Sequence, residues 1–389
     1  MNGGRLRASW GAALFLWSVL AVFRAPTYHL WLFALAATEW GHWLAAPALL
    51  TLAPGWERTR GGRWGAALGL GAALLFLTPA VRARALLSGG GLAARLAADF
   101  GAAAPRELPG APARPAPLVP LELWTGVRTP PVTETAEVFT RDCGGALRLQ
   151  LYRPAAAAGL LPVVLVIHGG SWQSGSRLEM PELSRYLAAR GYAVASLDYG
   201  LAPGARFPAQ VDDVREALDF LRRRAREWSL DTSRVALLGR SAGAQIALAA
   251  AASRGRFPEV RGVVDFYGPN DLRLAWTIPG SVWVLDSRKL LRQYLGGPPS
   301  EFPAGYDEGS ALTRAEKDFP PTLMIHGDRD MLVWPVHELR LSARLAGLGV
   351  AHEYLELPWA THGCDYVFSG PCGQVTTFAV ERFLAGVLR

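Results

Sequence analysis

The chain has 389 residues, of which 50% are hydrophobic and 19% charged, and this balance excludes an intrinsically disordered protein. Its three cysteines are too few for a small scaffold built on disulfides. Most of the net charge of +7 lies in residues 1–100, where nine arginines face three acidic residues, while the remainder holds 31 basic and 30 acidic side chains. Nucleic-acid binding needs basic residues clustered on a folded face, so this distribution argues against a nucleic-acid partner.

Residues 1–100 contain three apolar stretches, at 8–23, 28–52 and 64–81. A helix that crosses a bilayer needs about 20 mostly apolar residues, so the second and third stretches are long enough and the first is marginal. Arginines flank the stretches and tryptophans crowd their ends, as is typical of membrane interfaces. This pattern predicts a multi-pass membrane region with two to three transmembrane helices.

Two of these stretches have alternative interpretations. With its basic start, the first would also suit a signal peptide, and the second would suit a buried helix of a soluble protein because it contains Glu39. Glu39 and His42 share one helical face and would form a polar pair against a neighbouring helix, with a functional site inside the membrane as the alternative. Five arginines would lie on one side of the membrane and four on the other, a small difference that weakly favours placing the rest of the chain outside the cytoplasm.

Beyond residue 100 the composition changes twice. Residues 101–130 are rich in proline and alanine, which predicts a stiff, extended linker between the membrane and a globular domain at 131–389. That domain opens with an expected antiparallel pair, 137–141 and 146–152. Continuous apolar runs then alternate with helical patterns, at 162–167, 192–197, 234–238, 260–266, 321–325 and 352–357. The alternation predicts a mostly parallel sheet with helices on both faces.

Polar residues that suit one reaction follow four of these strands. They are His168-Gly169-Gly170, the serine of Gly239-Arg240-Ser241-Ala242-Gly243, the acids Asp328 and Asp330, and His362. The carboxyl ends of parallel strands meet at one edge of the sheet, where such folds place their chemistry.

The chemistry explains why these residue types belong together. A serine hydroxyl such as that of Ser241 becomes nucleophilic when an imidazole, here His362, can take its proton. The imidazole needs a carboxylate to fix its tautomer, a role for which Asp328 and Asp330 compete. Backbone amides, including that of Ala242 at a helix start, would stabilise the oxyanion of the tetrahedral intermediate.

Residues from about 134 to 389 resemble the α/β-hydrolase superfamily, in particular esterases with a His-Gly-Gly oxyanion loop. These include hormone-sensitive-lipase-like esterases, carboxylesterases and prenylcysteine methylesterases. Further matches are the stretches 197–203, 207–209 and 266–269, whereas Ser171 departs from the glycine found at the fourth position of many oxyanion loops. The resemblance implies an α/β-hydrolase fold, with Asp330 as the triad acid and Gly169 and Gly170 in the oxyanion hole.

In this fold the segment at about 270–313 would be a cap-like insertion over the substrate pocket. Trp172, Tyr267, Trp276 and Trp283 are the candidate substrate-binding residues, with ordinary aromatic packing as the alternative. Cys364 and Cys372 would form a disulfide in an oxidising compartment.

The sequence thus predicts a membrane-anchored serine hydrolase that cleaves carboxylic esters through an acyl-enzyme. Amidase, thioesterase or acyltransferase activity would use the same triad, and a non-catalytic membrane binding module is the remaining alternative. We expect a small-molecule or lipid-like ester as substrate, and neither metal nor cofactor, because the sequence contains no zinc-binding spacing and no phosphate-binding loop with lysine. The sequence leaves the oligomeric state open.

Overall fold

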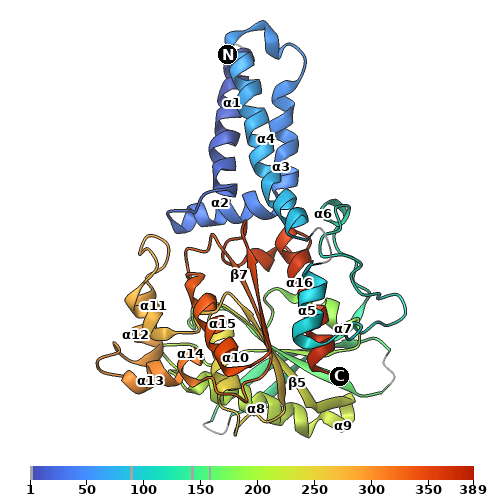
Figure 1. The fold of residues 1–389 in the computed structure, drawn as a ribbon, viewed down its shortest axis with the longest axis vertical. Coiled ribbons are helices and arrows are strands. Elements are labelled where there is room, and N and C mark those ends of the chain that lie inside the picture. Colours follow the sequence, from blue (N-terminus) through green and yellow to red (C-terminus); the bar gives the residue numbers. More distant parts are fainter. Residues whose placement is uncertain (1–2, 88–90, 142–143, 157–158) are drawn as a thin grey trace.

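The computed structural model describes residues 3–87, 91–141, 144–156 and 159–389. An N-terminal helical bundle stands on a domain built around an eight-stranded sheet with helices on both faces (Figure 1). The carboxyl edge of the sheet faces the bundle, so the strand-end loops lie close to its base.

The sheet has the strand order β1-β2-β4-β3-β5-β6-β7-β8. Strands β3 to β8 run parallel to one another, while β2 pairs antiparallel with both β1 and β4. The strands are β1 Val132–Thr140, β2 Ala146–Pro154, β3 Leu161–Ile167, β4 Ala193–Leu197, β5 Leu230–Arg240, β6 Val260–Phe266, β7 Thr322–Gly327 and β8 His352–Leu357. The mostly parallel sheet predicted from the apolar runs is confirmed.

Side chains of the central strands alternate between two hydrophobic cores. In β3, Val163 and Leu165 pack in the core that also holds α8 (Ala209–Arg223), α10 (Ala242–Ala252) and α15 (Val336–Leu348). Val164 and Val166 point the other way, to α5 (Gly91–Phe100), α7 (Pro181–Ala188) and α16 (Pro371–Val387). Because successive strand residues face opposite sides, a strand buried on both faces is apolar throughout.

The remaining elements lie around this sandwich. Between β6 and β7 a cap of short helices replaces the regular alternation of strand and helix, and it comprises α11 Leu272–Thr277, α12 Ser287–Leu295, α13 Pro303–Glu308 and α14 Ala311–Arg314. Two other short helices are α6 Glu122–Thr125 and α9 Ala225–Trp228. Short 3-10 turns occur at Val19–Ala21, Leu50–Leu52, Trp56–Arg58 and Cys364–Tyr366.

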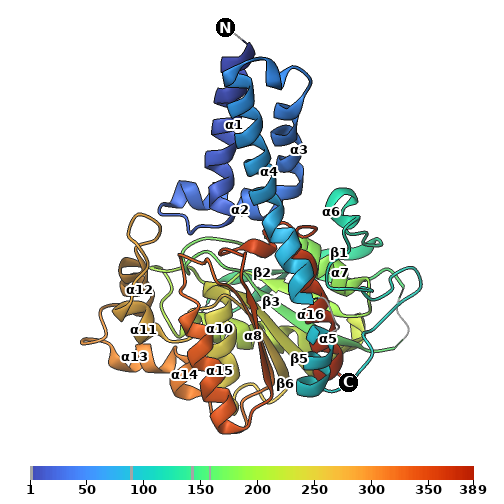
Figure 2. The ribbon, with the colours of Figure 1, turned by 45° about the horizontal axis from the view of Figure 1, so that its top comes forward.

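The N-terminal bundle differs from the predicted set of spans. It consists of α1 Gly3–Ser18, α2 Tyr28–Glu39, α3 Gly41–Leu49 and α4 Arg60–Leu87, with α2 lying across the base of the other three (Figures 1 and 2). The expected continuous span over 28–52 is wrong, because the chain turns at Trp40. Among the described residues only one helix, over Arg60–Ala85, is long and apolar enough to cross a membrane.

The turn at Trp40 follows from two buried polar side chains. Glu39 accepts a hydrogen bond from the backbone amide of Cys372 at 3.0 Å, and His42 Nε2 lies 2.7 Å from the carbonyl oxygen of Leu123. The two side chains therefore bind backbone groups of the later chain instead of forming a pair with each other. Because a buried polar group needs such a partner, these contacts fix the end of α2 and the start of α3 against the later chain.

The segment predicted as a linker also packs on that domain. Arg114 is 3% exposed, its amide donates to Glu381 and its guanidinium donates to Gln374, both on α16. Arg190 donates to the carbonyl oxygen of Pro112. Residues near 112–114 thus lie against α16, although the division into domains at 100 and 130 stays a prediction.

A disulfide between Cys364 and Cys372 closes the loop that joins the end of β8 to α16. The loop begins two residues after His362, and its amide at Cys372 is also the partner of Glu39. Closing a loop of this size removes conformational entropy from the unfolded chain equivalent to about 2.5 kcal/mol.

Replacing both cysteines with serine is therefore expected to lower the free energy of unfolding by about 2–3 kcal/mol. Denaturant unfolding of the wild type with and without reductant, beside the double variant, measures this. A double variant as stable as the oxidised wild type would contradict the stabilising role of the disulfide.

Candidate active site

Ser241 occupies the sharp turn between β5 and α10. Its backbone has φ 53° and ψ −120°, a strained conformation for a residue with a side chain. The turn needs small neighbours: a Cβ atom at Gly239 would collide with the carbonyl of Gly243, and one at Gly243 with the carbonyl of Ile167. The amide of Ser241 donates to the carbonyl of Phe266 at 2.8 Å, which ties the turn to β6.

His362 lies between Ser241 and Asp330. Its Nε2 is 2.9 Å from Ser241 Oγ and its Nδ1 is 2.6 Å from Asp330 Oδ2. With the proton on Nδ1, the imidazole donates to Asp330 and accepts from the serine hydroxyl. The structure thus brings together the three side chains that the sequence singled out, whereas Asp328 lies at the surface and pairs with Arg24.

Asp330 is buried and held by several donors. Its Oδ1 accepts the amides of Leu332 and Val333, and its Oδ2 also lies 3.0 Å from His326 Nε2. Burial alone would raise its pKa, but the charge of His362 and the hydrogen bonds from His326 and His362 outweigh burial and hold the pKa well below its usual value. Asp330 is therefore a carboxylate at neutral pH.

His326, the penultimate residue of β7, is a contributor that the sequence pattern did not single out. It is fully buried between Asp330 and Glu338, with its Nδ1 2.9 Å from Glu338 Oε1. Burial lowers its pKa, yet hydrogen bonds to the two carboxylates raise it to about 10. The spacing of His326 four residues before Asp330 was the available signal.

The oxyanion-loop candidates lie beside the serine. A Cβ atom built on Gly169 would be 3.4 Å from Ser241 Cβ, and Gly170 has φ +99°, which favours glycine. His168 stacks on Tyr199 with ring centroids 4.2 Å apart, and the Tyr199 hydroxyl donates to the carbonyls of His168 and Gly169. Ala242 is the first residue of α10, so its amide belongs to the unsatisfied N-terminal turn.

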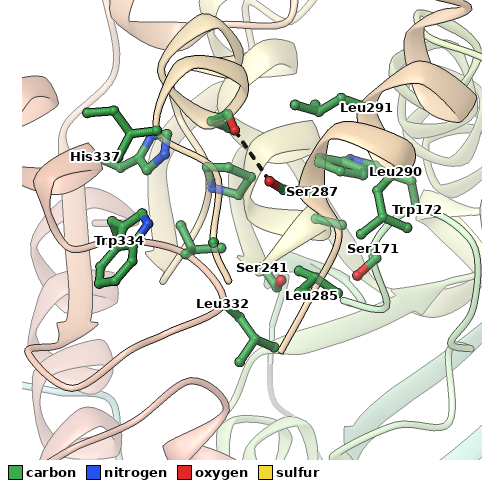
Figure 3. A pocket seen from close by; sticks show the side chains of 16 residues that line it. Ser171, Trp172, Ser241, Leu285, Ser287, Leu290, Leu291, Leu332, Trp334 and His337 are labelled. Carbon is green, nitrogen blue, oxygen red and sulfur yellow. Dashed lines mark hydrogen bonds between the residues drawn. The ribbon is translucent and has the colours of Figure 1, made fainter. Parts of the chain in front are cut away.

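A narrow, mostly apolar cavity of about 40 Å³ opens above Ser241 (Figure 3). The cap and the loop after Asp330 supply most of its walls, including Leu285, Leu290, Leu291, Leu332 and Trp334. Such a lining suits an uncharged, hydrophobic group. His337 also lines it, and burial lowers the pKa of this imidazole to about 3, which keeps it neutral.

The four predicted substrate-binding aromatics have different positions. Trp172 lines the cavity, stacked on Tyr294 with centroids 4.4 Å apart. Tyr267 does not line it but packs on the His362 ring at 4.5 Å and donates to Asp365. Trp276 packs against Tyr306 outside the cavity, and Trp283 is 78% exposed at the tip of a cap loop. Of the four, only Trp172 reaches the cavity.

Asp365 is a second residue of the site that no sequence motif indicated. It is buried, accepts the hydroxyl of Tyr267 at 2.6 Å and forms an ion pair with Arg240 at 2.6 Å. Arg240 directly precedes Ser241, so this cluster links the loop that carries His362 to the serine turn. No group of three or more His, Cys, Asp or Glu residues in the described ranges could hold a metal ion, and the expectation of no metal and no cofactor stays a prediction.

A pH dependence of stability follows from His326. A group whose pKa is higher in the folded protein stabilises it fully below the ordinary value of 6.5, and this stability is lost as the pH rises through about 10. We expect the free energy of unfolding of the wild type to fall between pH 7 and pH 10, and His326→Gln to lack that part of the fall. Urea unfolding at several pH values measures both, with His352→Gln as the control. Equal slopes in wild type and His326→Gln would contradict a charged His326.

Comparison with known proteins relates this site to esterases. The family model BD-FAE matches residues 149–345. Esterase LipC of Mycobacterium tuberculosis is 32% identical over 245 residues, which cover 59% of this chain and 59% of LipC. Isoprenylcysteine alpha-carbonyl methylesterase ICME of Arabidopsis thaliana is 37% identical over 103 residues, 26% of this chain and 24% of ICME. The chain thus spans well under two thirds of the length of these relatives.

Solved structures agree on the fold. The carboxylesterase EstE1, cloned from a metagenomic library, has a TM-score of 0.59 at 25% identity and covers 68% of this chain and 92% of its own. Esterase LipW of Mycobacterium marinum has a TM-score of 0.52 at 28% identity, and the match covers 66% of this chain and 80% of LipW. Because the family model matches half of its residues, this chain belongs to the BD-FAE family and has the α/β-hydrolase fold of these esterases.

Proposed function

We propose that the protein is a membrane-anchored serine hydrolase that cleaves carboxylic esters. The observation that carries the proposal is the continuous set of contacts from Ser241 through His362 to Asp330 beside a hydrophobic cavity. The names of the relatives, esterase and carboxylic ester hydrolase, support the same reaction class.

In the proposed reaction, Ser241 Oγ attacks the ester carbonyl while His362 Nε2 takes the hydroxyl proton. Asp330 holds the imidazole in the required tautomer and stabilises its charged form. The amides of Gly169, Gly170 and Ala242 would donate to the oxyanion of the tetrahedral intermediate.

The intermediate collapses when His362 returns the proton to the departing alcohol, which leaves Ser241 acylated. Water, deprotonated by the same imidazole, then attacks the acyl-enzyme and releases the acid. The cavity lined by Leu290 and Leu291 would hold a hydrophobic part of the ester.

The anchoring part of the proposal rests on α4. Its segment Arg60–Ala85 has 26 residues, or about 39 Å of helix, enough for a hydrocarbon core of about 30 Å. The disulfide Cys364–Cys372 supports placing the hydrolase domain on the oxidising, extracytoplasmic side.

Ser241→Ala is expected to abolish labelling by a fluorophosphonate and to reduce kcat/KM for p-nitrophenyl butyrate by about 10⁴-fold or more, because the nucleophile is lost. Ser253→Ala, at the far end of α10, is the matched control. Parallel assays with an amide, a thioester and an alcohol acceptor separate ester hydrolysis from the other reactions of the same triad. Full activity in Ser241→Ala would refute the assignment of the nucleophile.

Anchoring predicts that the full chain stays in the membrane pellet after an alkaline carbonate wash. Leu74 is 61% exposed on α4, so Leu74→Arg would place a charge in the hydrocarbon at about 2.5–3.5 kcal/mol and shift the protein out of the pellet. Leu339→Arg, at an exposed position of α15, should leave the distribution unchanged. Release of the wild type by the wash would contradict anchoring.

A further inference from the structure

The base of the N-terminal bundle contacts the loops that carry the candidate catalytic residues. Trp31 of α2 donates its indole N–H to the carbonyl oxygen of His362 at 3.1 Å. Arg24 donates to the carbonyl of Asp328 at 2.6 Å and lies over the ring of Trp334, 5.5 Å from its centroid. The N-terminal helices are therefore built onto the rim of the site.

The cap reaches the same place. The loop over residues 278–286, between α11 and α12, rises toward the start of α2 (Figures 1 and 2). At its tip, the carbonyl of Trp283 accepts the backbone amide of Tyr28 at 3.0 Å. From Ile278 to Leu285 the loop contains no charged residue.

This loop has two faces with different surroundings. Ile278, Gly280 and Leu285 line the cavity above Ser241, whereas Val282 and Trp283 at the tip are 70% and 78% exposed. One short segment thus forms both a wall of the cavity and an apolar surface outside it.

The start of α2, joined to this loop by the hydrogen bond at Tyr28, also carries exposed apolar side chains. We call the collar the set of exposed residues at the start of α2 and the tip of the cap loop: Tyr28, Leu32, Phe33, Val282 and Trp283. Large apolar groups at 44% exposure or more, held together on two connected segments, form a surface that water solvates poorly.

The position of the collar near the end of the apolar part of α4 indicates that a lipid bilayer covers it. The apolar part of α4 ends near Arg82, whose guanidinium donates to the carbonyl of Pro358 in the loop after β8. The polar boundary of a bilayer spanned by α4 therefore falls at the rim of the hydrolase domain, where Arg24 also lies. Tryptophan and tyrosine concentrate at such boundaries, and an uncharged apolar helix face lying across them binds the bilayer surface.

We propose that the collar lies in the bilayer surface and that a membrane-resident ester with a long apolar chain reaches Ser241 along the cap loop without leaving the lipid. The proposal rests on the function proposed above and adds the substrate class and the route of entry. The cap loop would deliver the apolar chain to Ile278 and Leu285, next to the leucines of the cavity.

Activity assays use the full chain reconstituted in phosphatidylcholine vesicles. Trp283→Ser is expected to raise KM for p-nitrophenyl palmitate embedded in the vesicles about tenfold, while kcat and the hydrolysis of water-soluble p-nitrophenyl butyrate stay unchanged. Trp283→Phe should retain activity on both esters. Leu160→Ser is the matched control, because Leu160 is 57% exposed and precedes β3, at the amino ends of the strands and away from the site. Equal loss on both esters in Trp283→Ser would show that the loop only supports the pocket, and would overturn lipid entry.

A fluorescent probe tests the position of the collar independently of activity. A nitrobenzoxadiazole label on Val282→Cys, with Cys143 replaced by serine, should be quenched by spin-labelled lipids, whereas the same label on Leu160→Cys should not. A label at 282 that spin-labelled lipids do not quench would overturn the proposal. The proposal would also be overturned if the label became shielded from water without lipid, to an extent that increases with protein concentration, because a second copy of the chain would then cover the collar. If the wild type hydrolysed neither ester, the proposed function would fail, and the label would still report whether the collar lies in lipid.

Discussion

The arrangement of the site depends on the two hydrogen bonds made by the imidazole of His362. The imidazole joins the turn after β5, which carries Ser241, to the loop after β7, which carries Asp330. Each partner is fixed separately, Ser241 by its strained backbone and Asp330 by two backbone amides and the imidazole of His326, so the His362 ring needs only to be held between them. The pair Arg240–Asp365, the ring of Tyr267 and the indole of Trp31 provide that hold.

Next to the contacts of His362, a second group of buried polar side chains surrounds Asp330. His326 bridges Asp330 and Glu338, and Glu338 in turn accepts the side-chain amide of Asn270 at the entrance to the cap. A charge removed from water needs partners of opposite sign, and here the partners form a chain from the candidate triad to the cap. The acid of the site and the covering of the cavity are thus built on one network.

The sequence predicted the parts of the fold that depend on local pattern. Apolar runs identified the strands, and the glycines beside Ser241 identified the turn, because strand burial and tight turns constrain neighbouring residues directly. The break of the second apolar stretch at Trp40 was missed, since it depends on Glu39 meeting an amide 333 positions later in the chain. Trp276 and Trp283 were candidates for the pocket because they lie in the expected cap-like insertion, but in an irregular cap the local backbone decides which way a side chain points. His326 was overlooked because burial in a strand normally indicates packing, and only the tertiary structure shows its carboxylate partners.

Because Trp31, Arg24 and Glu39 make hydrogen bonds to the later chain, the N-terminal bundle and the domain built on the sheet are not independent modules. Shortening the chain to begin after α4 would leave the carbonyl of His362 and the amide of Cys372 without their partners and would uncover the rim around Asp328. Relatives with a different N-terminal region would have to rebuild these contacts, so the bundle and the loops that carry the candidate triad are expected to change together during evolution.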